Sequence, residues 1–111
     1  MRIRLIHILF LFLTLLSLNV HANTTLGNRQ CTKWNEMRSM PSGDIKTMFE
    51  VTYQAWVFGF LSGIAVMGGG DFLGPVDPKQ VDRWMDQYCR KYPNNRIGEG
   101  ASEFYLKNSE K

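Results

Sequence analysis

Residues 77–93, DPKQVDRWMDQYCRKYP, specify a helix whose start, buried side and end can all be read from the sequence. Asp77 has the side chain of a helix N-cap, and Pro78 suits the first helical position, where no backbone N–H is needed. Pro93 ends the helix. Apolar residues recur at helical spacing and predict one buried stripe, made of Val81, Trp84, Met85, Tyr88, Cys89 and, at its end, Tyr92.

The charges of this helix follow its dipole. Asp82 and Asp86 lie early, whereas Arg90 and Lys91 lie in the last turn. Asp86 and Arg90 are four residues apart, so we expect an ion pair between them. The two aspartates are interpreted as charges on the face of a helix and not as a catalytic pair.

The first 22 residues have the order of a secretory signal peptide. Arg2 and Arg4 precede an apolar run over residues 5–20, and the run closes on Val20-His21-Ala22, which has small or apolar residues where a signal peptidase cuts. We therefore expect cleavage after Ala22, export to the periplasm, and one domain over residues 23–111. The alternative is an uncleaved membrane anchor, for which a run of this length is marginal.

Export fixes the interpretation of the two cysteines, Cys31 and Cys89. In an oxidising compartment one pair of cysteines predicts one disulfide, and the alternative is two buried thiols. Closing such a loop stabilises the folded chain by about 4 kcal/mol in the chain-entropy model. Because a domain of this size has a thin core, we expect its folding to depend on the bridge.

Cleavage of the signal peptide also removes residue types that catalysis and metal binding commonly use. Both histidines, His7 and His21, lie in it, so the remaining chain lacks the commonest general base and a common metal ligand. Without Arg2 and Arg4, eleven basic residues face ten acidic ones, with no block of like charge. We therefore expect no nucleic-acid partner, no catalytic residues, no metal and no cofactor.

A short helix is predicted over residues 31–40, with Cys31, Trp34 and Met37 on its buried side. A longer helix is predicted from Ser42 or Asp44 to about Met67. Its second half, residues 55–67, is apolar all round, which predicts that other elements surround it. The side of its first half that we expect to be buried carries Ile45, Met48, Phe49, Thr52, Tyr53, Trp56 and Phe60.

Ala55, Gly59 and Gly63 stand four residues apart on this helix and form a strip without bulky side chains. Such a strip lets another helix approach closely, and we expect that helix to belong to the same chain, with a homodimer as the alternative. Residues 51–70 carry no charge, so a membrane span is a further alternative. The strictly apolar part is about thirteen residues, which is the length of a core helix and favours a span less.

The segment from Gly68 to Pro78 is predicted to be a loop, and Phe72 and Leu73 in its middle either fold back on the core or contact a partner. A last helix is predicted from a cap at Asn94 or Asn95 to about Lys107, with Ile97, Ala101, Phe104 and Tyr105 on its apolar side. Residues 23–29 are expected to be frayed. The fold class is therefore all-α, a bundle of about four helices with one disulfide.

Three segments together resemble a known group of proteins. Trp56-Val57-Phe58-Gly59-Phe60-Leu61-Ser62-Gly63 is similar to an aromatic-x-x-Gly-aromatic-x-x-Gly helix, residues 84–93 to a helix with a cysteine four before a proline, and Cys31-Thr32-Lys33-Trp34 with Arg38 to an opening Cys-x-x-Trp segment. The group comprises small secreted bacterial helical proteins, including HdeA-like acid-stress chaperones and Rap/Tai-like amidase-immunity proteins of type VI secretion systems. The resemblance carries over Cys31 and Cys89 as the bridge and no other functional residue.

The resemblance and the stapled core favour a non-catalytic periplasmic protein that binds a protein partner, of the immunity or envelope-accessory type, with Phe72 and Leu73 as candidate contacts. An acid-activated chaperone is the first alternative, because protonating ten carboxylates takes the net charge of residues 23–111 from about +1 to about +11. An accessory factor of a secretion or conjugation system is the second alternative. An enzyme relying on carboxylates is disfavoured.

Overall fold

The computed structural model describes residues 26–110, so the signal peptide predicted for residues 1–22 lies outside the described residues. Four helices follow one another: α2 (Cys31–Ser39), α3 (Asp44–Gly68), α4 (Pro78–Lys91) and α5 (Ile97–Ser109). Over residues 26–110 there is no strand, and one isolated bridge joins Gln30 to Arg96. The predicted all-α fold of about four helices with one disulfide is confirmed.

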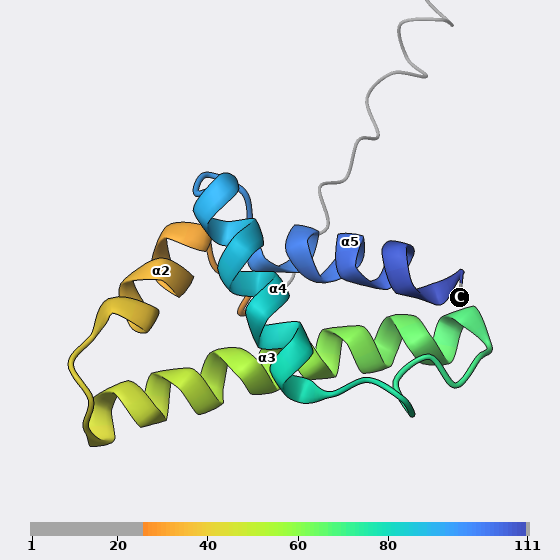
Figure 1. The fold of residues 1–111 in the computed structure, drawn as a ribbon, viewed down its shortest axis with the longest axis horizontal. Coiled ribbons are helices and arrows are strands. Elements are labelled where there is room, and N and C mark those ends of the chain that lie inside the picture. The colour runs from red at the N-terminus through yellow and green to blue at the C-terminus, as the bar shows by residue number, and fades with distance from the viewer. Residues whose placement is uncertain (1–25, 111) are drawn as a thin grey trace, which may run out of the picture.

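The long helix α3 forms the base on which the other helices are arranged (Figure 1). α2 packs near its N-terminal half and α5 runs beside its C-terminal half, while α4 packs against both α2 and α5. The fully buried side chains come from all four helices and close one core. The largest of them are Trp34, Phe104, Met37, Leu61, Met85, Ile97, Val57 and Val81, with Cys31 and Cys89 beside them.

The disulfide joins Cys31, the first residue of α2, to Cys89 near the end of α4, with 4.8 Å between their Cα atoms. Backbone hydrogen bonds reinforce this junction on both sides. The Cys31 N–H donates to the Asn95 carbonyl at 2.8 Å, and the Ile97 N–H donates to the Arg29 carbonyl at 2.9 Å. The segment before α2 is thus held against the turn between α4 and α5.

Helix α4 forms as its sequence predicts. The Asp77 carboxylate accepts a hydrogen bond from the Lys79 N–H at 2.9 Å, and Pro78 is the first helical residue. Four residues of the predicted stripe are buried, whereas Trp84 is half-buried and Tyr92 is exposed at the helix end. The four are Val81, Met85, Tyr88 and Cys89.

The start of α5 differs from the prediction, because Arg96 is the N-cap and not Asn94 or Asn95. The Glu99 carboxylate accepts from the Arg96 N–H at 3.0 Å, which satisfies a backbone donor at the helix start. The end at Ser109 lies two residues beyond the predicted Lys107.

Residues 26–29 are also held, although frayed residues were predicted there. The Asn28 side-chain oxygen accepts from the Gly98 N–H at 2.9 Å, and the Trp56 indole N–H donates to the Leu26 carbonyl at 2.6 Å. Residues from distant helices therefore supply the partners for this segment, which its own composition does not reveal.

Two predictions about α3 are wrong. Its fully buried residues are Val57, Leu61 and Ala65, so the buried face is turned away from the predicted stripe. The second half is not surrounded, because three shorter helices cover only one side of a 25-residue helix. Of the predicted stripe, Phe49, Tyr53, Trp56 and Phe60 are half-buried, whereas Ile45, Met48 and Thr52 are exposed.

The disulfide gives a first testable prediction. Because the bridge closes a loop between residues 58 apart, Cys31→Ser with Cys89→Ser should lower the free energy of unfolding by about 4 kcal/mol. Urea denaturation followed by circular dichroism measures the loss. The wild type treated with a reductant serves as the matched control and should lose a similar amount, and a reduced chain as stable as the oxidised one would contradict the prediction.

Candidate functional site

The most unusual surface of the described chain is the side of α3 that faces away from the other helices. We call it the outward face. Ile45 and Met48 on it are 69% and 58% exposed, and Val66 is 83% exposed. Neighbouring apolar side chains with this much exposure are typical of interaction surfaces. The outward face consists of Ile45, Met48, Val51, Thr52, Ala55, Gly59, Ser62, Gly63 and Val66, all of which are exposed.

The middle of the outward face has almost no side chain. A Cβ atom added to Gly59 or Gly63 would meet nothing within 4 Å. The prediction that the strip of Ala55, Gly59 and Gly63 packs within the chain is therefore wrong, because α2, α4 and α5 all lie on the opposite side. The strip is free for a helix from outside the described chain.

The opposite side of α3 explains why this helix belongs to the globule. On this side, Glu50 accepts a hydrogen bond from Arg38 of α2, and Gln54 donates one to Asp82 of α4. By length and composition alone α3 could cross a membrane, and 17% of its most apolar stretch is buried. The polar contacts and the core residues on its inner side join it to α2, α4 and α5.

A polar cluster joins α2, α3 and α4. Arg38 donates to both carboxylate oxygens of Asp86, at 2.8 Å each, and to Glu50 at 3.1 Å. The Trp34 indole N–H donates to the same Asp86 carboxylate at 2.9 Å. The predicted pair between Asp86 and Arg90 is absent among the ion pairs of the described residues, because the bidentate geometry with Arg38 uses both Asp86 oxygens.

Arg38 of this cluster and Asp82, which lies one turn before Asp86 on α4, have shifted pKa values. The hydrogen bond with Asp86 raises the pKa of the Arg38 guanidinium, which keeps that side chain charged. Burial raises the pKa of the Asp82 carboxyl, and the nearby Arg38 charge opposes this shift only in part. The hydrogen bonds and ion pairs of the cluster hold α2, α3 and α4 together.

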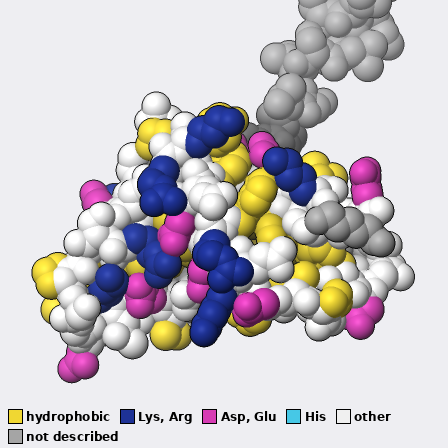
Figure 2. Space-filling view, viewed as in Figure 1, with side chains coloured by type: hydrophobic (Ala, Val, Ile, Leu, Met, Phe, Trp, Pro, Cys, Tyr) yellow, Lys and Arg dark blue, Asp and Glu magenta, His cyan; other side chains and the backbone are white. Residues whose placement is uncertain are grey.

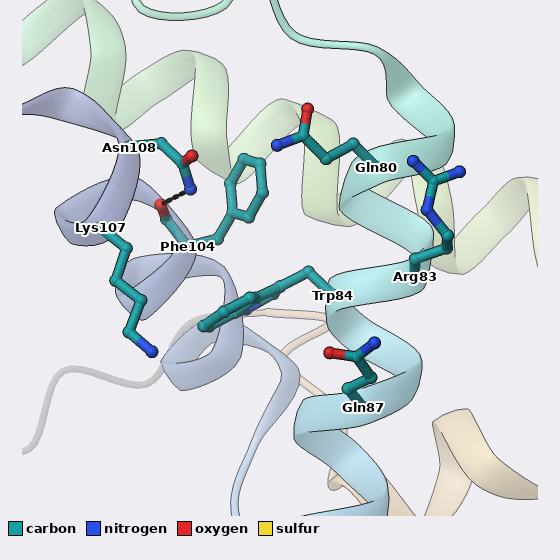
Figure 3. A pocket seen from close by; sticks show the side chains of 7 residues that line it. All are labelled: Gln80, Arg83, Trp84, Gln87, Phe104, Lys107 and Asn108. Atoms are coloured by element: carbon teal, nitrogen blue, oxygen red, sulfur yellow. Dashed lines mark hydrogen bonds between the residues drawn. The ribbon is translucent and has the colours of Figure 1, made fainter. Parts of the chain in front are cut away.

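Figure 3 shows an open hollow of about 430 Å³ between α4 and α5, with the Trp84 ring as its floor. The Trp84 indole N–H donates to the Gly100 carbonyl at 2.8 Å, which fixes the ring, and Lys107 lies 4.8 Å from the ring centroid. Gln80, Arg83, Gln87, Phe104 and Asn108 line the rest. None of these lining residues is a carboxylate, a histidine or a cysteine. Figure 2 shows hydrophobic side chains exposed between α4 and α5 with Lys and Arg side chains around them.

The predicted contact residues Phe72 and Leu73 are both half-buried. The Phe72 ring meets Phe104 and Tyr105 edge to face, with centroids 6.0 Å and 5.0 Å apart. The loop thus folds back on the core, which was the first of the two interpretations. Phe72 also lines a shallow hollow of about 470 Å³ beside Gly70.

Among the described residues, no three His, Cys, Asp or Glu side chains are grouped so that they could hold a metal ion. Both cysteines of residues 26–110 are used in the disulfide. The structure thus has a disulfide-linked core and an apolar outward face. The feature of the sequence that indicates this face is the uncharged run over residues 51–70.

Comparisons with protein-family models, with curated proteins and with solved structures find no match for this chain. The resemblance to small secreted helical proteins therefore rests on the sequence motifs alone.

Replacing Asp82 and replacing Asp86, which lie on the same helix, should change the stability of the fold in opposite directions. Burial raises the pKa of Asp82 in the folded protein, so the charged carboxylate lowers the stability of the fold at pH 7. In the unfolded chain the pKa of Asp is about 3.9. As the pH falls from the folded pKa to this unfolded pKa, protonation of Asp82 removes the loss of stability. Asp82→Asn should therefore raise the thermal midpoint at pH 7, and the gain should vanish below about pH 4.

Asp86→Asn is the matched control. It weakens the charged hydrogen bonds with Arg38 and should lower the free energy of unfolding by about 1–3 kcal/mol at pH 7. Calorimetry at pH 7 and pH 4 measures both variants. A loss of stability for Asp82→Asn at pH 7 would contradict the assigned effect of burial.

Proposed function

We propose that this chain is a non-catalytic, exported protein that acts by binding a protein through the outward face of α3. The observation that carries the proposal is the exposure of Met48, Val51 and Val66 along one uncharged helix side, with Val66 83% exposed. Covering such a surface removes apolar area from water at no cost in buried charge. Helix-in-groove or helix-on-helix recognition uses residues at this spacing.

Two further observations support export and a binding role. The disulfide between Cys31 and Cys89 is compatible with an oxidising compartment such as the periplasm. The motifs shared with small secreted proteins favour an immunity or envelope-accessory partner. The neighbouring genes distinguish these two types, since an effector gene beside this one indicates immunity and a secretion or conjugation operon indicates an accessory role.

Partner capture from the envelope tests the proposal. Val66→Asp and Met48→Asp place a charge at an exposed position that would be buried on binding, so each should reduce capture by about tenfold or more. Leu106→Asp is the matched control, because Leu106 is 63% exposed but lies on α5. Affinity purification of the exported protein with quantitative mass spectrometry measures capture. Equal capture by all four proteins would contradict a role for the outward face.

An acid-activated chaperone is the second candidate, and the Arg38 cluster favours it. Arg38 of α2 forms ion pairs with Asp86 of α4 at 2.8 Å and with Glu50 of α3 at 3.1 Å. Strong acid removes these charges and adds self-repulsion, so the helices separate and expose more apolar surface.

The chaperone candidate predicts protection of an aggregating client protein near pH 2–3. Asp86→Asn with Glu50→Gln mimics the protonated cluster and should move the onset of protection to higher pH. Light scattering of the client on return to pH 7 measures protection. Its absence at every pH would remove this candidate.

A further inference from the structure

We propose that the protein that covers the outward face is a second copy of this chain, with two α3 helices packed antiparallel about a twofold axis. This inference rests on the proposed function, because it names the occupant of the same face. Its basis is the spacing of the exposed residues, their charge, their hydrogen bonding and the length of the helix.

The outward face has the residue spacing of an antiparallel helix pair. Six exposed residues follow one another at alternating steps of four and three, which is the seam of two helices that pack along their length. They are Met48, Thr52, Ala55, Gly59, Ser62 and Val66. The described chain offers no helix to this seam, since α2 and α5 pack on the other side of α3.

The seam is complementary to itself in one orientation. With a twofold axis at the level of Val57, Met48 of one copy meets Val66 of the other, and Ala55 meets Gly59. Val51, at the edge of the seam, lies over Gly63, where an added Cβ meets nothing within 4 Å. Each large side chain thus faces a smaller one, as close helix packing requires.

A parallel pair does not fit in this way. It places Met48 opposite Met48 and Val51 opposite Val51, so the larger side chains meet each other instead of a smaller residue. It also aligns the two helix dipoles in the same direction, whereas an antiparallel pair sets each positive end beside a negative one.

The polar atoms of the seam are already satisfied. The Thr52 hydroxyl donates to the Met48 carbonyl and the Ser62 hydroxyl donates to the Phe58 carbonyl, each at 2.7 Å within the helix. A second helix can therefore cover both residues without leaving a buried donor unpaired. No acidic or basic residue occurs from Val51 to Gly70, so two identical faces bring no like charges together.

The size of the surface is sufficient for a specific dimer. Helix α3 has 25 residues and is therefore about 37 Å long. With the axis at Val57, residues 46–68 of the two copies overlap over about 34 Å. A contact strip of about 15 Å in width then covers about 500 Å² on each copy, or about 1,000 Å² in total, which is the lower limit for a specific interface. A twofold interface of this kind closes on itself and gives a dimer rather than a filament.

A membrane surface fits the outward face less well. Helices that lie on lipid carry Lys and Arg beside a side rich in Trp, Phe and Leu. Here the aromatic residues Phe49, Trp56 and Phe60 are half-buried, and none of the exposed residues of the outward face is Trp, Phe or Leu. The exposed centre is made of Ala55, Gly59 and Gly63, which bury little area in lipid but let two helix backbones approach.

Gly59→Leu provides the sharpest test because its two effects have opposite signs. In a single copy the new side chain points into open space and replaces a poor helix former, so the thermal midpoint of the monomer should rise by a few degrees. In the dimer the new leucine side chain occupies the space that Ala55 of the other copy needs, so self-association should weaken by about tenfold or more. Val66→Asp should weaken it to a similar extent, and Leu106→Asp should leave it unchanged.

The exported, oxidised protein is measured by light scattering coupled to size exclusion at pH 7, from about 1 to 200 µM, with partner capture measured in parallel. Twice the chain mass for the wild type and Leu106→Asp, with one chain mass for Gly59→Leu and Val66→Asp, is the expected result. A monomeric wild type at every concentration overturns the dimer. Capture that still depends on Val66 in such a monomer keeps the proposed function with a different partner, and binding to anionic vesicles that depends on Val66 assigns the face to lipid. A dimer that persists in both α3 variants places the interface elsewhere and also overturns the inference.

Discussion

The covalent link between Cys31 and Cys89 is the constraint on which the rest of this structure depends. It joins the start of α2 to the last turns of α4, and the backbone hydrogen bonds between the segment before α2 and residues 93–97 form around it. A core this small gains little from burial beyond what chain entropy removes. The link reduces the entropy of the unfolded chain, so a few buried side chains are enough to position α4 and α5 on α3.

The same small size explains the outward face. A helix of 25 residues has far more surface than three shorter helices can cover, so the core takes one side of α3 and leaves the other apolar and exposed. Contact of this apolar surface with water is unfavourable, which supports the proposal that a partner covers it. The polar cluster at Arg38 joins α2, α3 and α4, and the hollow at Trp84 lies between α4 and α5.

The sequence predicted α4 well because every signal in residues 77–93 was local. The Asp77 cap, the Pro78 start, the apolar spacing and the Pro93 end act within a few residues of one another, and the helix formed at those bounds. The start of α5 was less well predicted because its cap depends on Asn28, which lies 70 residues from its hydrogen-bond partner Gly98. The Asp86 side chain likewise had a reasonable local partner in Arg90, but Arg38 from α2 offers two parallel hydrogen bonds and is favoured.

By itself, the sequence determined the helical class, the order and bounds of most helices, and the pairing of Cys31 with Cys89, since two cysteines allow one pairing. Only the tertiary structure decided which side of α3 is buried. The apolar run over residues 51–70 has no polar side to orient it, so the choice was made by the inner contacts of Glu50 and Gln54 and by Val57, Leu61 and Ala65. Periodicity orients a helix only when its two sides differ in polarity, and the second half of α3 has no such difference.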